Sequence, residues 1–422
     1  MLDIKFIREN KELIQAGAQK KRMEFDVEKL LSVDTIRREL VTSVEGRKAD
    51  QNKVSQQITV ETDAEKRNAL IEEMRTLKDS IKADEERLAE VMKEWQLQMV
   101  SVPNIPDMSV PEGESDADNV EVKKWGDAQT FPFEAKSHID IMEELDLADF
   151  KKGTDVSGFR GYFLKNGAAE LSLAIWMYAR DFWTKKGFSF MIVPSLVRRE
   201  TLFGTGYLPQ GEEDLYKTQD GDFLAGTAEV ATMAYFADTE IPKNELPKKV
   251  LAFSPCFRRE AGSHGKDVKG LIRVHEFFKM EQVVLCEASH EESVKLHEEI
   301  NRNTEEFIES LGIPYHTVVN CGGDLGLGQV KKYDIELWVP GEQKYREISS
   351  ASYFHDFQAR RLNIKYRDEE NKSRFVHSLN CTAIPTPRIL VSLIENYQQE
   401  DGTIRLPEIL RPYMANKEVI GK

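Results

Sequence analysis

Residues 27–100 contain no proline and only one glycine, Gly46. A stretch of this length without helix-breaking residues favours long, continuous helices. Its second half repeats apolar side chains at coiled-coil spacing, and its first half shows a weaker form of the same pattern. The expected seam residues are Leu40, Val44, Arg47, Gln51, Val54, Ile58, Leu70, Met74, Leu77, Ile81, Leu88, Met92, Trp95 and Met99.

The pattern breaks near residues 59–63, where Asp63 is a candidate helix cap. Two helices of similar length with a short break between them are predicted to fold back as an antiparallel hairpin. About 30 residues in each helix would make an arm of roughly 45 Å. A dimerisation coiled coil or a solvated spacer explains this pattern as well as a lever that reaches a distant partner does.

The character of the chain changes after the arm. Residues 103–126 hold three prolines and an acidic cluster, which predicts a linker. From residue 127 onward the pattern is mixed α and β. We therefore expect an N-terminal domain over 1–102, with the arm at about 27–100, a linker over 103–126, and a second domain over 127–422 in an α+β chain.

The overall charge limits the possible partners. The chain has 58 lysines and arginines against 73 aspartates and glutamates, a net charge of −15. A chain this acidic is unlike a nonspecific nucleic-acid binder, so any nucleic-acid contact must come from a local basic surface.

The cysteine pattern and the hydropathy of the chain indicate where in the cell the protein is expected. None of the four cysteines lies in a C-x-x-C pair, so we expect no zinc site, and four free thiols suit a reducing cytosol. There is no apolar signal core and no run near the ~20 apolar residues of a membrane span. A soluble, cytoplasmic protein with no membrane partner is expected.

One stretch, residues 253–281, predicts an antiparallel hairpin. Leu251–Phe257 and Leu271–Met280 have the character of strands, and the loop Ala261–Gly270 holds three glycines and should lie on the surface. Alternation along the strands gathers four side chains on one surface, namely Arg258, Glu260, Arg273 and Phe277. Guanidinium groups bind phosphate or carboxylate, an aromatic ring beside an arginine stacks on a base, and a carboxylate accepts from an amine. These are the parts of a nucleotide site, although an amphipathic hairpin with a solvated charged face would have the same pattern.

Three other stretches carry polar residues with two interpretations each. Thr227 and Glu229 could bind a small polar ligand or simply cap the helix that follows. Glu347 and Ser350 are oxygen ligands of the kind that Mg²⁺ accepts beside phosphates, or they lie at a solvated strand end. Residues 378–388 open a helix predicted over 389–398, where Arg388 could clamp a phosphate, or they are an ordinary proline-marked helix start.

The segment FRREAGSHGKDVKGLIRVHEFFKMEQ resembles motif 2 of the class II aminoacyl-tRNA synthetases, in the form found in seryl-tRNA synthetases. The apolar helix Ala168–Lys185, followed by a strand over Phe188–Val193 and then Pro194, resembles motif 1. The segment LNCTAIPTPRILVSLIENYQQEDGTIRLPEILRPYM resembles motif 3, and the hairpin resembles the family's N-terminal arm. The resemblance covers nearly the whole chain. It implies a class II antiparallel sheet with flanking helices, preceded by an all-α antiparallel coiled-coil hairpin.

The resemblance also implies a reaction. ATP and L-serine form seryl-adenylate and pyrophosphate, and serine then passes to the 3′ end of tRNA(Ser), or of tRNA(Sec) where that tRNA exists. Motif 1 implies a homodimer, with tRNA lying along the arm. The candidate phosphate contacts on the arm are Arg47, Lys48, Lys53, Lys66, Arg67, Arg75 and Lys78. Two alternatives are a class II-derived ligase that loads a carrier protein and a non-enzymatic coiled-coil adaptor.

The implied site residues form overlapping sets. Arg258 would bridge the α-phosphate and the serine carboxylate, with Arg388 as the second catalytic residue. The serine-binding set is Thr227, Glu229, Arg258, Glu281, Asn380 and Thr382, with Glu281 and Thr382 expected at the hydroxyl. The ATP-binding set is Arg258, Arg259, Glu260, Arg273, Val274, Phe277, Glu347, Ile348, Ser349, Ser350 and Arg388. Glu347 and Ser350 would hold Mg²⁺.

Overall fold

The computed structural model describes residues 1–262, 265 and 267–421, and the chain divides into two compact units, Met1–Ile105 and Pro106–Lys422. Three residues of the predicted surface loop, Ser263, His264 and Lys266, lie outside the described residues. None of the helices in the described part of the chain combines the length and apolar character that a membrane crossing requires.

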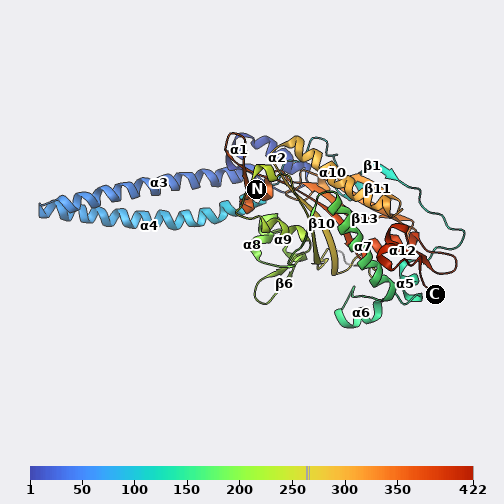
Figure 1. Ribbon diagram of the computed structural model, residues 1–422. Helices are drawn as coiled ribbons and strands as arrows, with labels where there is room; N and C mark the ends of the chain where they lie inside the picture. Colours follow the sequence, from blue (N-terminus) through green and yellow to red (C-terminus); the bar gives the residue numbers. More distant parts are fainter. Residues whose placement is uncertain (263–264, 266, 422) are drawn as a thin grey trace. The chain divides into compact units, whose positions relative to one another are not determined.

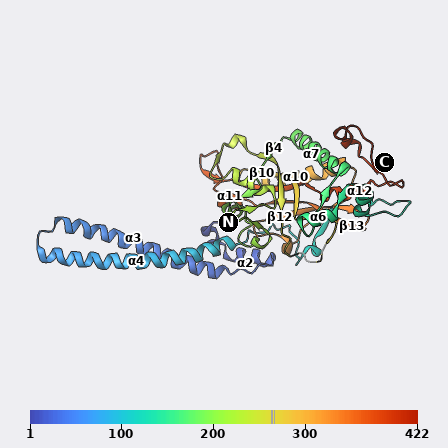
Figure 2. The same ribbon diagram turned by 90° about the horizontal axis from the view of Figure 1, so that it is seen from below.

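The first unit is entirely helical. Its elements are α1 (Ile4–Glu9), α2 (Lys11–Lys20), α3 (Val27–Val60) and α4 (Ala64–Ser101). The last two helices run side by side as an antiparallel hairpin in both views (Figures 1 and 2). The predicted hairpin and its break before residue 64 are confirmed.

Local capping and the apolar seam explain this hairpin. Asp63 caps α4, since its side chain accepts hydrogen bonds from the first backbone N–H groups of that helix. None of the predicted seam residues is exposed. Polar contacts across the pair also fix the register: the Ser43 hydroxyl donates to Asp84 at 2.9 Å, and Arg47 forms an ion pair with the same carboxylate at 3.3 Å.

The second unit is built on an eight-stranded sheet, in the order β1-β11-β12-β13-β16-β10-β9-β4. All neighbouring pairs are antiparallel except β4 and β9, which are parallel. The strands are β1 (Val120–Trp125), β4 (Ser189–Ile192), β9 (Lys248–Phe257), β10 (Glu276–Cys286), β11 (Tyr315–Val319), β12 (Lys331–Val339), β13 (Lys344–Tyr353) and β16 (His377–Thr386). The predicted class II sheet is confirmed.

Helices cover both faces of this sheet. The helices of this unit are α5 (His138–Glu144), α6 (Phe150–Ser157), α7 (Asn166–Lys185), α8 (Arg199–Thr205), α9 (Ala228–Tyr235), α10 (His290–Ser310), α11 (Phe357–Leu362) and α12 (Arg388–Asn396). Short pairings complete the unit: β2 (Ala148–Asp149) with β3 (Phe163–Leu164); β5 (Leu196–Val197) and β6 (Tyr216–Lys217) with β7 (Phe223–Leu224); β8 (Glu240–Ile241) and β15 (Ser373–Phe375) with β14 (Lys365–Arg367); and β17 (Ile404–Arg405) with β18 (Val419–Ile420).

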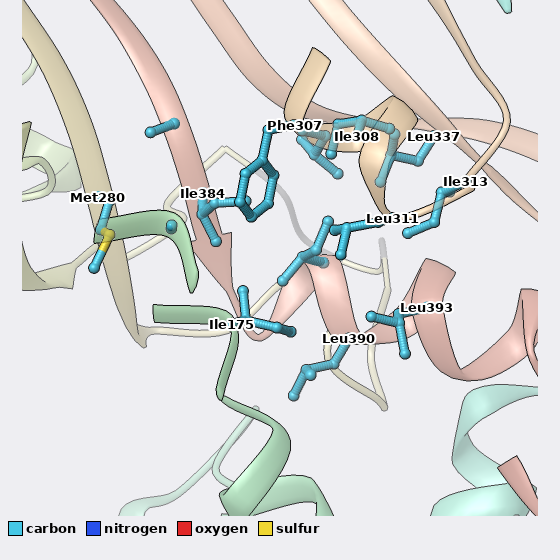
Figure 3. Close-up of a cluster of buried hydrophobic side chains, with 14 of the residues drawn as sticks. Ile175, Met280, Phe307, Ile308, Leu311, Ile313, Leu337, Ile384, Leu390 and Leu393 are labelled. Carbon is cyan, nitrogen blue, oxygen red and sulfur yellow. The ribbon is translucent and has the colours of Figure 1, made fainter. Parts of the chain in front are cut away.

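Alternation along the central strands divides the core between the two faces. On one face α7, α10 and α12 bury a large apolar cluster against the sheet, including Ile175, Phe307 and Leu390 (Figure 3). Leu251 of β9 belongs to this cluster, whereas its neighbours Val250 and Ala252 pack on the other face with α8 and α9. Glu281 of β10 lies opposite Ala252 in the ladder and Thr382 of β16 lies opposite Glu281, so these polar side chains are also on the second face.

The predicted strand over Leu271–Met280 is wrong in its first half, since β10 begins only at Glu276. The backbone N–H of Leu271 donates to Nε2 of His138 at 3.3 Å and not to a neighbouring strand. Arg258 and Arg273 thus lie just beyond the regular ladder, and period-2 alternation does not govern their directions.

Candidate active site

The hairpin of β9 and β10 places Arg258 at its loop end, directly after the last residue of β9. The backbone N–H of Arg258 donates to the carbonyl of His275 at 2.9 Å, which aligns the two chain segments beyond the ladder. Its side-chain Nε donates to the carbonyl of Gly226 at 3.2 Å. The guanidinium carbon lies 5.4 Å from the centre of the Phe277 ring, within the range of a cation–π contact. Arg258 is thereby fixed next to an aromatic face.

A pocket opens around this arginine. Its lining brings together residues from the segment between β9 and β10, from strands β10, β13 and β16, and from the start of α12. The lining residues are Arg258, Glu260, Leu271, Ile272, Arg273, Val274, Phe277, Lys279, Glu347, Ile348, Thr382, Pro385, Thr386, Pro387 and Arg388. Nine residues of the predicted site are among them: Arg258, Glu260, Arg273, Val274, Phe277, Glu347, Ile348, Thr382 and Arg388.

Arg388 is the first residue of α12 and is held by two main-chain carbonyls. Its Nε donates to Ile272 at 3.0 Å and its Nη1 to Glu347 at 2.7 Å. Burial lowers the pKa of Arg388, and the positive charges of Arg258 and Arg273 act in the same direction. Three guanidinium groups close to one another favour an anionic ligand.

Two carboxylates balance part of this charge. Arg273 forms an ion pair with Glu260, and its Nε lies 3.6 Å from a carboxylate oxygen of Asp267. Asp267 also pairs with Arg346 at 2.9 Å. Glu260 has a left-handed backbone with a φ of 54°, an uncommon conformation for a residue with a side chain.

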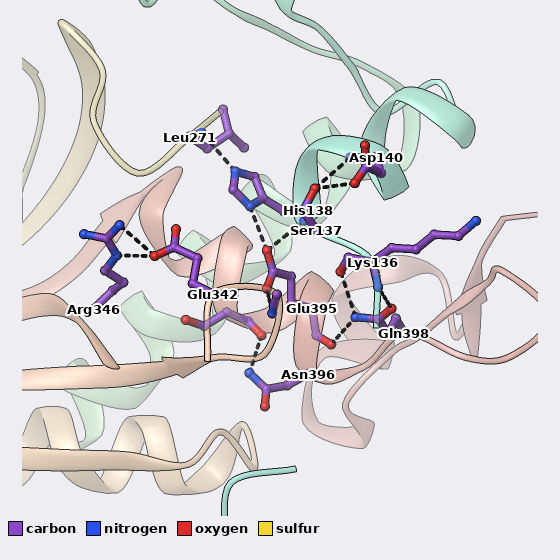
Figure 4. Close-up of polar contacts among 12 residues, drawn as sticks. Lys136, Ser137, His138, Asp140, Leu271, Glu342, Arg346, Glu395, Asn396 and Gln398 are labelled. Atoms are coloured by element: carbon purple, nitrogen blue, oxygen red, sulfur yellow. Dashed lines mark hydrogen bonds and ion pairs between the residues drawn. The ribbon is translucent and has the colours of Figure 1, made fainter. Parts of the chain in front are cut away.

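A buried polar pair supports the wall of the pocket from behind (Figure 4). The Nδ1 atom of His138 and the carboxylate of Glu395 lie 2.8 Å apart, and the other oxygen of Glu395 accepts from the N–H of Gly341 at 2.7 Å. Because Nε2 of His138 accepts from Leu271, the proton of the neutral ring is on Nδ1. This network joins α5, α12 and the segment that leads into β10.

Deeper on the same side lies a cluster around Glu281. Its carboxylate forms a buried ion pair with Lys279 at 2.5 Å. The hydroxyls of Thr382 and Thr227 lie 3.4 and 3.5 Å from the same carboxylate oxygen. Thr227 is also the N-cap of α9, so the predicted capping role and the contact with the predicted serine site occur together.

Glu229 is buried next to this cluster. Gln358 donates to its carboxylate at 2.7 Å and Tyr207 at 3.3 Å, and Asn380 provides a further hydrogen bond. Burial raises the pKa of Glu229, as does the nearby charge of Glu281. The predicted serine-binding residues therefore lie in two adjoining groups, one around Glu281 and one around Glu229.

Strand register explains how Glu347 and Ser350 come to share a face although they are three residues apart. On β12, Asp334 and Glu336 are two apart and point the same way, and their partners across the ladder are Ser350 and Glu347. The extra residue on β13 is Ile348, at a β-bulge. The bulge redirects the Glu347 side chain.

Two predicted ATP-binding residues direct their side chains elsewhere. Arg259 is exposed, and its Nη1 donates to the carbonyl of Glu213 at 3.1 Å. Ser349 is buried and donates to the carbonyl of Thr382 at 2.5 Å. Any contact of these two with ATP stays a prediction.

The sequence prediction missed Lys279, Tyr207 and Gln358 as parts of the site. Lys279 had a usable signal, because it is a charged residue in an apolar strand on the same face as Glu281. The Tyr207 and Gln358 contacts join segments distant in sequence, and no local pattern marks them.

Each of the two units matches a known protein family. Residues 1–106 match the family described as the seryl-tRNA synthetase N-terminal domain, and residues 216–397 match the tRNA synthetase class II core domain (G, H, P, S and T). The chain is 44% identical to a serine–tRNA ligase of Deinococcus radiodurans, over 100% of this chain and 99% of the relative.

Solved structures agree with these matches. Seryl-tRNA synthetase from Pyrococcus horikoshii, complexed with ATP, has a TM-score of 0.92 at 38% identity, covering 100% of this chain and 99% of that one. The cytoplasmic serine–tRNA ligase of Naegleria fowleri, in complex with AMP, has a TM-score of 0.87 at 32% identity with the same coverage.

Proposed function

The chain belongs to the seryl-tRNA synthetases, a family of class II aminoacyl-tRNA synthetases, and we propose that the pocket between Arg258 and Arg388 is where it activates L-serine with ATP. The enzyme is an ATP-dependent ligase that forms seryl-adenylate and pyrophosphate and then transfers serine to the 3′ end of tRNA(Ser). The observation that carries the site assignment is the convergence of three guanidinium groups and an aromatic ring in one cavity. By the same proposal, tRNA(Sec) is a second acceptor where it exists.

In the first step a serine carboxylate oxygen attacks the α-phosphorus of ATP, and pyrophosphate leaves with the electron pair of the broken P–O bond. Two anions must therefore be held together while negative charge builds up on the phosphate. Arg258 supports this role because its side chain is fixed by Gly226 and turned toward the ring of Phe277. Arg388 and Arg273 provide the further positive charge for the phosphates. Phe277 stacks on adenine, and Glu260 accepts from the adenine amine.

Mg²⁺ accompanies ATP as part of the substrate. The carboxylate of Glu347, which is exposed in the pocket, and the hydroxyl of Ser350 on the same strand face are suitable oxygen ligands. The described residues contain no cluster of three or more His, Cys, Asp or Glu side chains that would hold a metal alone. A site with few protein ligands suits Mg²⁺, which usually keeps waters and binds substrate phosphates.

Serine binds beside the phosphate end of the pocket. Its carboxylate contacts Arg258, and its hydroxyl and ammonium contact the groups around Glu281, Thr382, Thr227, Glu229 and Asn380. A buried carboxylate that must accept a hydrogen bond disfavours substrates that lack a hydroxyl, because it would be left unpaired.

The tRNA partner is assigned to residues 1–102, with residues 127–422 as the catalytic part. Of the basic residues proposed as phosphate contacts, Arg47, Lys48, Lys53 and Arg75 already form ion pairs on the arm. Lys66, Arg67 and Lys78 are exposed, and no ion pair is found for them among the described residues. These three, near the helix junction and along α4, are the strongest candidates for contact with tRNA.

A homodimer is supported by an apolar surface on the motif 1 elements. Strand β4 is the edge of the large sheet, and its Ile192 is 74% exposed. On α7, Leu173 is 57% exposed and Met177 45% exposed. An unpaired edge strand beside apolar side chains fits association with a second copy. The cytoplasm is the proposed location, where the four buried thiols would remain reduced.

Serine-dependent exchange of pyrophosphate into ATP tests the activation step, with serine, threonine and alanine compared on the full chain. We expect exchange with serine, at least tenfold less with threonine, and loss of exchange in Arg258→Ala. Arg367→Ala, which removes an exposed arginine paired with Glu240, is the matched control. Charging of tRNA(Ser) tests the second step. Exchange without charging would instead favour transfer to a carrier protein, and absence of exchange would overturn the assignment.

A further inference from the structure

Lys279 is nearly buried in the interior of the catalytic unit. Its side chain is 6% exposed and that of Glu281 is 3% exposed, and the two lie on the same face of β10. Removing an ammonium and a carboxylate from water is costly, and the attraction between them often does no more than offset that cost. A buried pair at the base of a binding pocket therefore calls for an explanation other than stability.

The hydrogen bonds around Glu281 are arranged unevenly. Lys279 at 2.5 Å, Thr382 at 3.4 Å and Thr227 at 3.5 Å all approach Oε2. Among the residues that the structure describes, none donates a hydrogen bond to Oε1. Oε2 is thus saturated by the protein, and Oε1 is the oxygen left to accept from a ligand.

The charges that face Glu281 explain why a cation is needed. The titratable groups around it are Glu229 on α9, Tyr207 after α8, Cys256 and Arg258 at the end of β9, and Cys381 on β16. Burial raises the pKa of Tyr207, Cys256 and Cys381, so these groups are neutral near pH 7. Glu229 is a second carboxyl group beside Glu281, and Arg258 is engaged at the phosphate end. Lys279 is the cation in direct contact with Glu281.

We propose that Lys279 determines specificity as a positioning residue: its ammonium holds Oε2 of Glu281 and turns the carboxylate so that Oε1 requires a donor on the substrate. An ionised carboxylate only accepts hydrogen bonds, whereas a protonated one also donates and tolerates a substrate without a hydroxyl. Lys279 would therefore enforce the choice of serine over alanine without touching the hydroxyl itself. This inference rests on the proposed serine site.

The test compares kcat/KM for serine and alanine in pyrophosphate exchange from pH 6 to pH 9. The variants are Lys279→Met, Lys279→Arg, Glu281→Gln and the double variant Lys279→Met with Glu281→Gln. Lys249→Met is the matched control, since Lys249 is a partly buried lysine on β9 paired with Glu299 at 2.6 Å. Methionine keeps the length of the side chain without its charge.

In Lys279→Met we expect the serine-to-alanine ratio to fall about 10-fold to 100-fold while the ATP KM changes less than about threefold. The KM for serine should fall as pH rises, because a buried carboxylate without its cation takes up a proton more readily. Lys279→Arg should restore most of the ratio, and the double variant should be no worse than Glu281→Gln alone.

The results distinguish an error in the proposed serine site from an error in the role of Lys279. If Glu281→Gln leaves the serine-to-alanine ratio unchanged, the proposed serine site is wrong. If Glu281→Gln lowers the ratio but Lys279→Met neither lowers it nor introduces a pH dependence, the role of Lys279 is wrong. If Lys279→Met does not fold, as judged by circular dichroism, the serine-to-alanine ratios of Lys279→Arg and of the double variant test the role of Lys279 instead. A double variant clearly worse than Glu281→Gln alone would show that Lys279 acts apart from Glu281.

Discussion

Arg388 donates a hydrogen bond from Nη1 to the main-chain carbonyl of Glu347 at 2.7 Å, joining the start of α12 to strand β13. This bond to a main-chain carbonyl restricts the orientation of the guanidinium group. Together with the second bond, from Nε to Ile272, it fixes the guanidinium at the lining of the pocket, where a nucleotide is proposed to bind.

Replacing Arg388 with lysine keeps the charge but removes the planar, multidentate group. We expect kcat/KM for ATP in serine-dependent exchange to fall about 100-fold, since a lysine cannot hold both carbonyls and a phosphate. The KM for serine should change much less. Arg367→Lys serves as a control, and similar losses for both substrates would show that the whole pocket had collapsed.

Truncating Glu281 separates the two substrates. Glu281→Ala should raise the KM for serine about 10-fold to 100-fold through loss of a charged hydrogen-bond acceptor, with little effect on the KM for ATP. Steady-state exchange with each substrate varied in turn provides the measurement. Equal changes in both constants would remove Glu281 from the serine site.

Shortening the arm tests its part in tRNA binding. Deleting residues 44–83 and closing the gap with a short glycine-serine turn preserves the contact of Ser43 with Asp84 at the cut. The shortened enzyme should retain serine-dependent exchange within about twofold and lose tRNA charging. Deleting residues 29–94 is a more severe version, which also removes Leu30 from the apolar base of the arm. Full charging by either variant would contradict the proposed tRNA contact.

Burial of His297 predicts a loss of stability in mild acid. Burial lowers its pKa to about 4, whereas an unfolded imidazole titrates near 6.5. Between these values the unfolded chain binds more protons, so this contribution is complete above about pH 6.5 and is lost as pH falls toward 4. The loss is about 3 kcal/mol at most.

Urea unfolding of the wild type and of His297→Gln at several pH values measures this contribution. The glutamine can still donate to the carbonyl of Ala351, which His297 reaches at 2.9 Å. The difference in free energy of unfolding between the two proteins should shrink as pH falls from 6.5 to 4. Parallel pH profiles would contradict the role of His297.

A charge on the edge strand should separate the proposed dimer. Ile192→Glu would place a carboxylate in an apolar interface, and we expect the mass in solution to fall to that of one chain at micromolar concentration. Light scattering after size-exclusion chromatography gives the mass. Val60→Glu, at a side chain 77% exposed on the arm, should leave the mass unchanged. A monomeric wild type would refute the proposal directly.

The sequence predicted best those features that depend on local periodicity. The arm helices and α7 follow apolar repeats and capping residues, and their predicted limits agree with the structure to within three residues. Strand β16 was missed, because Ser378, Asn380 and Thr382 give it a polar composition although the strand is buried on both sides between β13 and β10. Only the assembled sheet makes such polar residues interior.

Prediction of the site was limited in the same way, because part of its geometry depends on the assembled sheet. Arg258, Glu260, Arg273 and Phe277 do line one pocket, as predicted, but the first three reach it from irregular backbone and not through strand alternation. The extra residue at Ile348, which lets Glu347 and Ser350 share a face, follows from pairing with β12. A single strand's sequence holds no information about the register of its neighbour.

The pairing of Arg273 with Glu260 and Asp267 affects how the enzyme should respond to ionic strength. A triphosphate that binds Arg273 displaces the two carboxylates that already contact this side chain. The net charge at the site therefore changes less than it would if a triphosphate bound three arginines without partners. Added salt weakens the displaced contacts together with the new ones. Nucleotide affinity should therefore tolerate salt better than tRNA affinity, which should fall steeply if the proposed contacts with exposed lysines and arginines are correct.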